Sequence, residues 1–210
     1  MDTDLVLIVV IAINAIVSYK GFNDEAFKRK YLFHIGAIRA GEQYRMFTSA
    51  FLHADMTHLI FNMITLFFFA PWVIGALGTI GFLIVYFVSL FAGNLLSLYF
   101  HKNEYNYSAL GASGAVVGVV FSAILIYPEM KINFFIPGYL YGIFYLLFST
   151  YGMKAKRDNI GHTAHFGGAI GGYAITLSRM PEIFQHNTFV VIVLAVPIII
   201  LFVMAKMGKL

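Results

Sequence analysis

The sequence contains no cysteine and few charged residues. Without cysteine, the 210-residue chain can form no disulfide, thiolate metal site or haem-attachment motif, and it has no cysteine nucleophile. Charged residues make up 11% of the chain and hydrophobic residues 60%, whereas about a quarter of an ordinary soluble domain is charged. Disordered chains and coiled coils need abundant charge, so both are excluded. The net charge of +4 supplies no basic face for nucleic acid, and lipid is the expected solvent.

Long apolar runs are the main positive feature of the sequence. The hydrocarbon core of a bilayer is about 30 Å thick, and a helix needs about 20 apolar residues to cross it. Seven windows of this kind are present, at roughly 5–19, 56–76, 78–100, 108–127, 132–151, 160–178 and 188–205. Only residues 75–78 separate the second and third windows, which predicts a tight helical hairpin. The expected fold class is an all-α polytopic membrane protein.

Two segments depart from this pattern. Residues 20–55 form a long first loop with several Lys and Arg among Phe, Tyr and Ile, which predicts a folded element in the membrane interface. The window 132–151 contains Pro137-Gly138 and many aromatic residues. Proline removes a backbone donor and glycine loosens the backbone, so this helix is expected to be irregular or mobile. Its bulky side chains, such as Tyr145 and Phe148, could form a gate for a substrate helix.

Polar residues inside the windows indicate function, because burying them in lipid is unfavourable. No Asp, Glu, Lys or Arg lies well inside any window. Proton pumps and ion-coupled carriers usually need an intramembrane carboxylate, aspartyl proteases need two aspartates, and zinc proteases need His-Glu-x-x-His. None of these classes fits. From the remaining histidines, asparagines and hydroxyls we expect no metal or other cofactor.

The first two polar stretches provide a helix face and a glycine-flanked serine. His58 and Asn62 are four residues apart, so they share one face of the predicted helix 56–76. Ser113 lies in Gly111-Ala112-Ser113-Gly114, near the start of the window 108–127. Glycine on both sides lets another backbone or a substrate approach Ser113 closely.

The third stretch carries His165, near the start of the window 160–178. Glycines four residues apart follow on adjoining faces of both helices: Gly114 and Gly118, and Gly168 and Gly172. Small residues at this spacing allow close helix contact in lipid. The two helices could therefore bring Ser113 within reach of His165.

A serine and a neutral imidazole suffice for nucleophilic catalysis. His165 can take the Ser113 proton and later give it to the leaving amine. No window offers the carboxylate of a serine triad, so the predicted site is a dyad. The developing oxyanion also needs hydrogen-bond donors. The candidates are Asn62, His58 and the backbone amide of Ser113.

On these motifs the sequence resembles the rhomboid family of intramembrane serine proteases. The resemblance covers residues 42–178 and rests on Tyr44-Arg45, His53-x4-His58-x3-Asn62, Gly111-x-Ser113-Gly114 and Ala164-His165-x2-Gly168-x3-Gly172. It implies that Ser113 is the nucleophile and His165 the general base, with an oxyanion hole lined by His58 and Asn62. It implies supporting roles for His53, Arg45, Gly111, Gly114, Gly168 and Gly172. His53 would tie the first loop to the helix 56–76.

The resemblance also implies how the chain is organised. Residues 1–180 would form a rhomboid-like six-helix core, with 20–55 as its membrane-embedded first loop. Residues 186–210 would add a C-terminal transmembrane helix. The expected location is a bacterial inner membrane, and the expected partners are the lipid bilayer and membrane-protein substrates cleaved in their transmembrane segments. No cofactor and no nucleic-acid partner are expected.

One departure from the family concerns the proposed base. Val117 stands one helical turn after Ser113, where some family members have an aromatic ring packed on the catalytic histidine. Without that ring, the orientation of His165 is expected to depend on helix packing alone. Of the remaining histidines, His162 is expected to be structural. Three others fall in predicted loops and are expected to be solvated: His34, His101 and His186.

Two interpretations of different classes remain open. One is an intramembrane serine endopeptidase. The other is a catalytically silent rhomboid-like fold that binds membrane proteins without cleaving them. Inactive relatives usually lack the serine or the histidine, and this chain keeps both Ser113 and His165.

Overall fold

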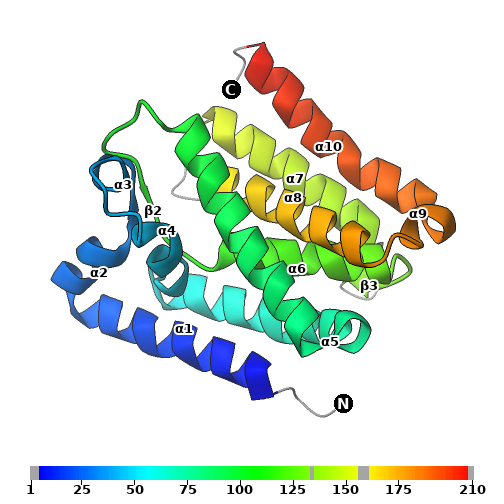
Figure 1. The fold of residues 1–210 in the computed structure, drawn as a ribbon, viewed down its shortest axis with the longest axis horizontal. Coiled ribbons are helices and arrows are strands. Elements are labelled where there is room, and N and C mark those ends of the chain that lie inside the picture. The colour runs from blue at the N-terminus through cyan, green and yellow to red at the C-terminus, as the bar shows by residue number, and fades with distance from the viewer. Residues whose placement is uncertain (1–4, 133–134, 156–160, 208–210) are drawn as a thin grey trace.

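The computed structural model describes residues 5–132, 135–155 and 161–207, and most of them are helical. The long helices, shown in Figure 1, are α1 (Leu5–Asn23), α5 (Met56–Phe100), α6 (Ser113–Ile126), α7 (Gly138–Ala155), α8 (His162–Arg179) and α10 (Thr188–Lys206). A short helix, α9 (Ile183–His186), precedes α10. Every predicted apolar window contains a helix, with two of the windows inside α5.

A glycine divides α5 into two helical segments. Its 45 residues would extend roughly 68 Å if straight, about twice the thickness of a bilayer core. Gly78 has φ 71° and ψ 170°, a conformation that a residue with a Cβ adopts only with strain. The chain changes direction there, as Figure 1 shows near the α5 label. The hairpin predicted at residues 75–78 is confirmed.

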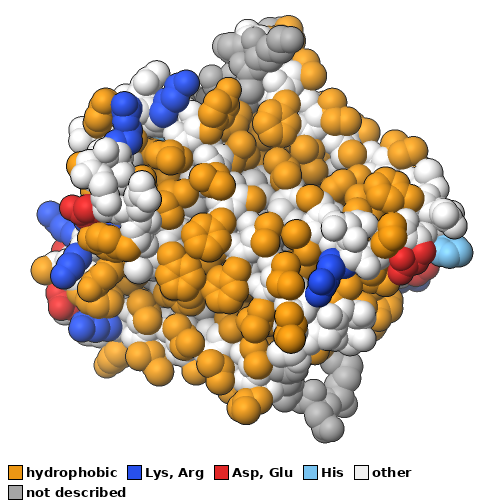
Figure 2. All heavy atoms as spheres, in the orientation of Figure 1, with side chains coloured by type: hydrophobic (Ala, Val, Ile, Leu, Met, Phe, Trp, Pro, Cys, Tyr) orange, Lys and Arg blue, Asp and Glu red, His pale blue; other side chains and the backbone are white. Residues whose placement is uncertain are grey.

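The surface and the helix lengths both fit a membrane protein. Of the described helices, α1 and α5 are long and apolar enough to cross a bilayer, and α6 and parts of α7 and α10 are shorter apolar helices. Large apolar side chains are exposed along them, including Phe61, Ile80 and Phe144. Figure 2 shows hydrophobic side chains over most of one face, with charged side chains mainly at the side of α2 and α3 and near α9. Lipid can cover such a surface, whereas a protein that exposed it to water would be prone to aggregate.

The first loop is folded, as its aromatic and basic residues predict. It contains α2 (Glu25–Tyr31), β1 (Phe33–His34), α3 (Ile35–Arg39), α4 (Arg45–Thr48) and the 3₁₀ helix η1 (Ser49–Phe51). Strand β1 pairs antiparallel with β2 (Ser108–Ala109), with Phe33 opposite Ala109. This pairing attaches the first loop to the segment that leads into α6.

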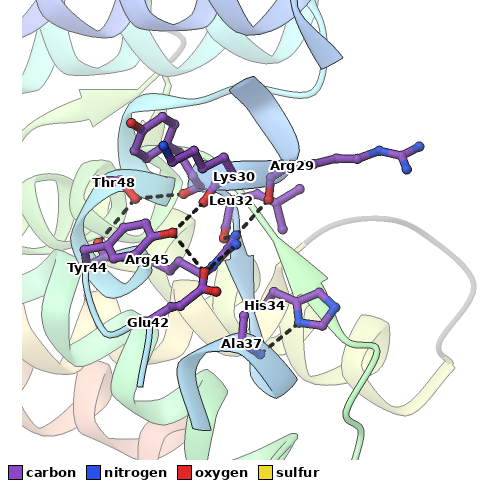
Figure 3. Close-up of polar contacts among 10 residues, drawn as sticks. Arg29, Lys30, Leu32, His34, Ala37, Glu42, Tyr44, Arg45 and Thr48 are labelled. Carbon is purple, nitrogen blue, oxygen red and sulfur yellow. Dashed lines mark hydrogen bonds and ion pairs between the residues drawn. The ribbon is translucent and has the colours of Figure 1, made fainter. Parts of the chain in front are cut away.

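A buried arginine joins the parts of this loop. Arg45 is 8% exposed, and its Nε and Nη2 atoms each lie 2.7 Å from the Glu42 carboxylate. Its Nη1 atom donates to the carbonyls of Arg29 and Leu32, at 2.8 and 3.0 Å (Figure 3). Hydrogen bonds from Tyr44 and Arg45 hold the pKa of Glu42 below its ordinary value. Every Arg45 nitrogen therefore has a partner, and the interactions connect α4 and the turn before it to α2 and to Leu32, the residue that follows α2.

The expectation for the window 132–151 was wrong at its start. Residues 131–132 form β3 (Lys131–Ile132), which pairs antiparallel with β4 (Ile136–Pro137), and α7 begins at Gly138. Pro137 therefore precedes the helix and does not interrupt it. Proline lacks the N–H that a helix interior needs and biases the preceding residue to an extended conformation. Both effects favour a strand that ends where the helix begins.

Candidate active site

Ser113 is the first residue of α6, and Gly111 determines how the chain reaches it. Gly111 has φ 128°, and its N–H donates to the Ser49 carbonyl at 3.0 Å. A Cβ at this glycine would lie 2.7 Å from Cε1 of His58. Both the backbone conformation and the space require glycine here. At the start of α6, moreover, the first backbone N–H groups have no acceptor within the helix.

Glycines of α6 and α8 face one another where the two helices come closest. A Cβ on Gly168 would overlap the Gly114 carbonyl, and a Cβ on Gly172 would overlap the Gly118 carbonyl. The Ala164 carbonyl oxygen lies 3.1 Å from where a Cβ on Gly114 would be. The residues next to Ser113 and His165 in sequence are therefore in contact. This is the close approach that the glycine spacing predicts.

A second glycine face of α8 packs against α5, which the sequence analysis did not anticipate. A Cβ on Gly167 would overlap the Ala92 carbonyl, and one on Gly171 would lie 2.8 Å from Cα of Ser89. Helix α8 is thus held between α5 and α6, with its glycines in close contact with the backbones of both helices. The two Gly-Gly pairs of α8, at 167–168 and 171–172, are the sequence signal for a helix packed closely on both sides.

The predicted catalytic and oxyanion-hole residues line one cavity of about 530 Å³. Ser113 and His165 lie in its wall, together with His58 and Asn62. Tyr145 of α7 and several apolar residues of α5 and α6 complete the lining. The structure records no hydrogen bond between the side chains of Ser113 and His165, two residues that it describes. Catalytic hydrogen bonds are often longer before substrate binds than in the reacting complex.

His165 has a partner that the sequence analysis missed. The Tyr145 hydroxyl lies 2.8 Å from its Nδ1 atom, and the two ring centroids are 5.5 Å apart. The expectation that helix packing alone orients His165 was therefore wrong. Val117 also lines the cavity, but the aromatic ring beside His165 comes from α7. Replacing Tyr145 therefore changes the surroundings of His165 as well as the lining of the cavity.

His58 and Asn62 share the first turns of α5. The Asp55 carboxylate caps this helix by accepting from the His58 backbone N–H at 2.8 Å. The Asn62 amide donates to the His58 carbonyl at 3.0 Å. Asn62 has a second amide hydrogen. One donor of Asn62 is therefore used within the helix, and the residue still borders the cavity.

His53 is buried beneath this site and has two hydrogen-bonding partners. Its Nε2 atom accepts from the Ala112 N–H at 3.4 Å, and its Nδ1 atom lies 2.7 Å from the Ser18 hydroxyl oxygen. Because a backbone N–H must donate, the proton of neutral His53 is on Nδ1 and points to Ser18. Ser18 in turn donates to the Phe51 carbonyl at 3.0 Å. The ring also packs edge-on against His58, with centroids 5.0 Å apart.

These contacts extend the role expected of His53. The expectation was a tie between the first loop and the helix 56–76, whereas the hydrogen bonds lead to α1 and to the residue before α6. Burial, and to a smaller extent the neighbouring His58, lowers the pKa of His53 to about 3. His53 is therefore neutral at physiological pH, as its directed hydrogen bonds require.

Two of the three histidines expected to be solvated have structural contacts. The His34 Nδ1 atom accepts from the Ala37 N–H at 3.2 Å and caps α3. The His101 ring stacks on Tyr107 with centroids 3.7 Å apart, and its Nε2 atom lies 3.0 Å from the Thr163 hydroxyl. His162 is buried, as its expected structural role requires. Among the described residues, no group of three His, Cys, Asp or Glu side chains is arranged to hold a metal.

A family model described as Rhomboid domain matches residues 40–182, more than half of the chain. The chain belongs to the rhomboid family. The match spans the first-loop arginine, the cavity and the glycine contacts of this rhomboid, and it ends before α10.

Relatives of this rhomboid occur in bacteria and in eukaryotic organelles. It is 33% identical over 139 residues to "Putative rhomboid protease YdcA" of Bacillus subtilis, covering 66% of this chain and 68% of that protein. It is 29% identical over 188 residues to "RHOMBOID-like protein 12, mitochondrial" of Arabidopsis thaliana, covering 80% and 56%. It is 27% identical over 159 residues to "Rhomboid protease AarA" of Providencia stuartii, covering 66% and 56%. The chain thus spans about half to two thirds of the length of these relatives.

Proposed function

We propose that this rhomboid is an intramembrane serine endopeptidase, in which Ser113 is the nucleophile and His165 the general base. The observation that carries the proposal is the glycine contact between α6 and α8, at which both residues border one cavity. The names of YdcA and AarA as rhomboid proteases also support it. Its substrates would be membrane proteins, and cleavage would occur in or near a transmembrane segment.

The chemistry follows from the proposed dyad. Nε2 of His165 takes the proton of the Ser113 hydroxyl as the oxygen attacks the substrate carbonyl carbon. The resulting oxyanion would accept hydrogen bonds from the Ser113 amide and from the side chains of His58 and Asn62. His165 then gives its proton to the leaving amine. Water, deprotonated by the same imidazole, hydrolyses the acyl-enzyme and restores the serine.

Cleavage of a membrane reporter by the purified protein tests this proposal. The reporter is a single transmembrane segment with a fluorophore at one end, placed in liposomes with the rhomboid. Ser113→Ala and His165→Ala should each abolish cleavage, and the double variant should be no worse than either, because the two residues act as a unit. Normal turnover by either single variant would remove the dyad assignment.

Two control variants match these substitutions. Ser97→Ala removes a buried hydroxyl that donates to the Gly93 carbonyl within α5, and His186→Ala removes an exposed histidine. Both should cleave at the wild-type rate. If the wild-type protein is folded and cleaves nothing, the silent, client-binding interpretation replaces the protease. Residence in a bacterial inner membrane is a further part of the proposal, since the relatives include both bacterial and mitochondrial proteins.

A further inference from the structure

Tyr145 connects the proposed base to a third helix. It lies on α7, and its hydroxyl is 2.8 Å from Nδ1 of His165 on α8. Its ring stacks on that of Tyr141, one helical turn earlier, with centroids 6.1 Å apart. On the same helix, Phe144 and Phe148 are exposed on the outside of the molecule. Tyr141 and Tyr145 are the α7 side chains that line the cavity, and the Tyr145 hydroxyl is the one that contacts His165.

We propose that Tyr145 is the positioning residue of the base. Its hydroxyl oxygen accepts a hydrogen bond from Nδ1–H of His165 and so keeps Nε2 unprotonated for Ser113. This inference rests on the dyad proposed above. It adds a residue on another helix, and it assigns the tautomer of His165.

The direction of the hydrogen bond decides whether His165 can act as a base. A neutral imidazole has one N–H and one free lone pair. If Tyr145 donated to Nδ1, the proton of His165 would be on Nε2, and the nitrogen needed by the proposed dyad would have no lone pair. If Tyr145 accepts from Nδ1–H, Nε2 carries the lone pair that can take the Ser113 proton. The same hydrogen bond persists when His165 becomes an imidazolium, because Nδ1 keeps its hydrogen throughout.

A phenol suits this position better than a carboxylate. In serine triads a buried aspartate holds the imidazole tautomer and orientation. Placing an ionised carboxylate in the membrane interior is energetically unfavourable, and no apolar window of this chain contains an Asp or Glu. A neutral hydroxyl accepts the same hydrogen bond without adding a charge. Since Tyr145 is on α7, displacing α7 from α8 by about 1 Å would stretch the bond beyond hydrogen-bonding distance and release the ring.

The variant Tyr145→Phe isolates the hydroxyl. It keeps the aromatic ring beside His165 and removes only the acceptor. We expect kcat for the membrane reporter to fall about tenfold with KM unchanged, since the substrate still binds but the base is less often in its reactive tautomer. The matched control is Tyr173→Phe, which removes a tyrosine hydroxyl that donates to the Val191 carbonyl at 3.0 Å between α8 and α10. The control should retain the wild-type kcat.

A larger substitution separates positioning from gating. If Tyr145 only blocks the entry of substrate, Tyr145→Phe should be neutral and Tyr145→Ala should raise turnover. If it positions His165, both variants should lower turnover. Wild-type kcat in a folded Tyr145→Phe protein would overturn the proposal, and thermal melting of each variant establishes that it is folded.

Nitrogen NMR provides a readout that does not depend on activity. In protein labelled with ¹⁵N-histidine, the His165 resonances are assigned by their loss in His165→Gln. The wild-type spectrum should show a protonated Nδ1 and an unprotonated Nε2, and Tyr145→Phe should show a mixture of the two tautomers. A wild-type His165 protonated on Nε2 would overturn the proposal even if the enzyme is active. If the protein cleaves nothing but shows the Nδ1–H tautomer and loses it in Tyr145→Phe, the contact stands and the protease proposal fails.

Discussion

Adding one methyl group at Gly168 should separate the two proposed catalytic helices. In Gly168→Ala, the new Cβ would overlap the carbonyl oxygen of Gly114, which belongs to the backbone of α6 and cannot rotate away. The helices must move apart or tilt. The matched change is Gly75→Ala in α5, where a Cβ would have no heavy atom within 4 Å.

The expected changes in the free energy of unfolding have opposite signs in the two variants. Alanine is favoured over glycine in a helix by about 0.5–1 kcal/mol, and this is the only contribution expected at Gly75. At Gly168 the steric overlap adds a penalty of about 1–3 kcal/mol, as for other overpacked interiors. Gly168→Ala should therefore destabilise the fold by up to about 2.5 kcal/mol, while Gly75→Ala stabilises it slightly. A shift of about 1 Å between Ser113 and His165 should also lower the cleavage rate roughly a hundredfold.

Two assays on the same detergent preparations measure these effects. Unfolding by increasing SDS gives the stability difference, and cleavage of the membrane reporter gives the rate. If Gly168→Ala is as stable and as active as Gly75→Ala, the glycine contact is not what brings Ser113 and His165 together.

Three further changes probe the surroundings of the cavity. The pKa of His53, ordinarily about 6.5, is lowered to about 3 in the fold, so below pH 6.5 the unfolded chain takes up a proton that the folded chain does not. Wild-type unfolding free energy should thus fall between pH 7 and 5 by about 2 kcal/mol more than that of His53→Gln, and parallel SDS-unfolding curves would contradict this. Asn62→Ala should lower kcat roughly 100- to 1,000-fold without changing the melting temperature, and an unchanged rate would leave Asn62 a packing residue. Gly111→Ala should lower both stability, by about 1–3 kcal/mol, and cleavage, since its Cβ would meet the His58 ring; an unaltered melting curve would refute that steric argument.

The sequence predicts the helices and their contacts well where the signal is local. Hydropathy over about 20 residues identifies the helical segments, and the short break at residues 75–78, with a glycine at each end, predicts the turn at Gly78. Small residues four apart predict the contact of Gly114 with Gly168. The start of α7 was misplaced because hydropathy counts Pro137 as part of an apolar run, although proline also ends extended segments.

Contacts between distant residues could not be obtained in this way. Tyr145 is one of several tyrosines in its window, and neither spacing nor hydropathy distinguishes it from Tyr141. Only the packing of α7 on α8 brings its hydroxyl to His165. The partners of His53 are similarly hidden, because Ser18 and Ala112 lie far away in the chain and carry no motif.

Reaction with a small fluorophosphonate tests the proposed dyad most directly, since it requires no knowledge of the substrate. A serine activated by a neutral histidine attacks this reagent, whereas an ordinary membrane serine does not. We predict that labelling maps to Ser113 alone, disappears in Ser113→Ala and in His165→Ala, and persists in Ser97→Ala. No labelling of the folded wild-type protein, or labelling that persists without His165, would contradict the account.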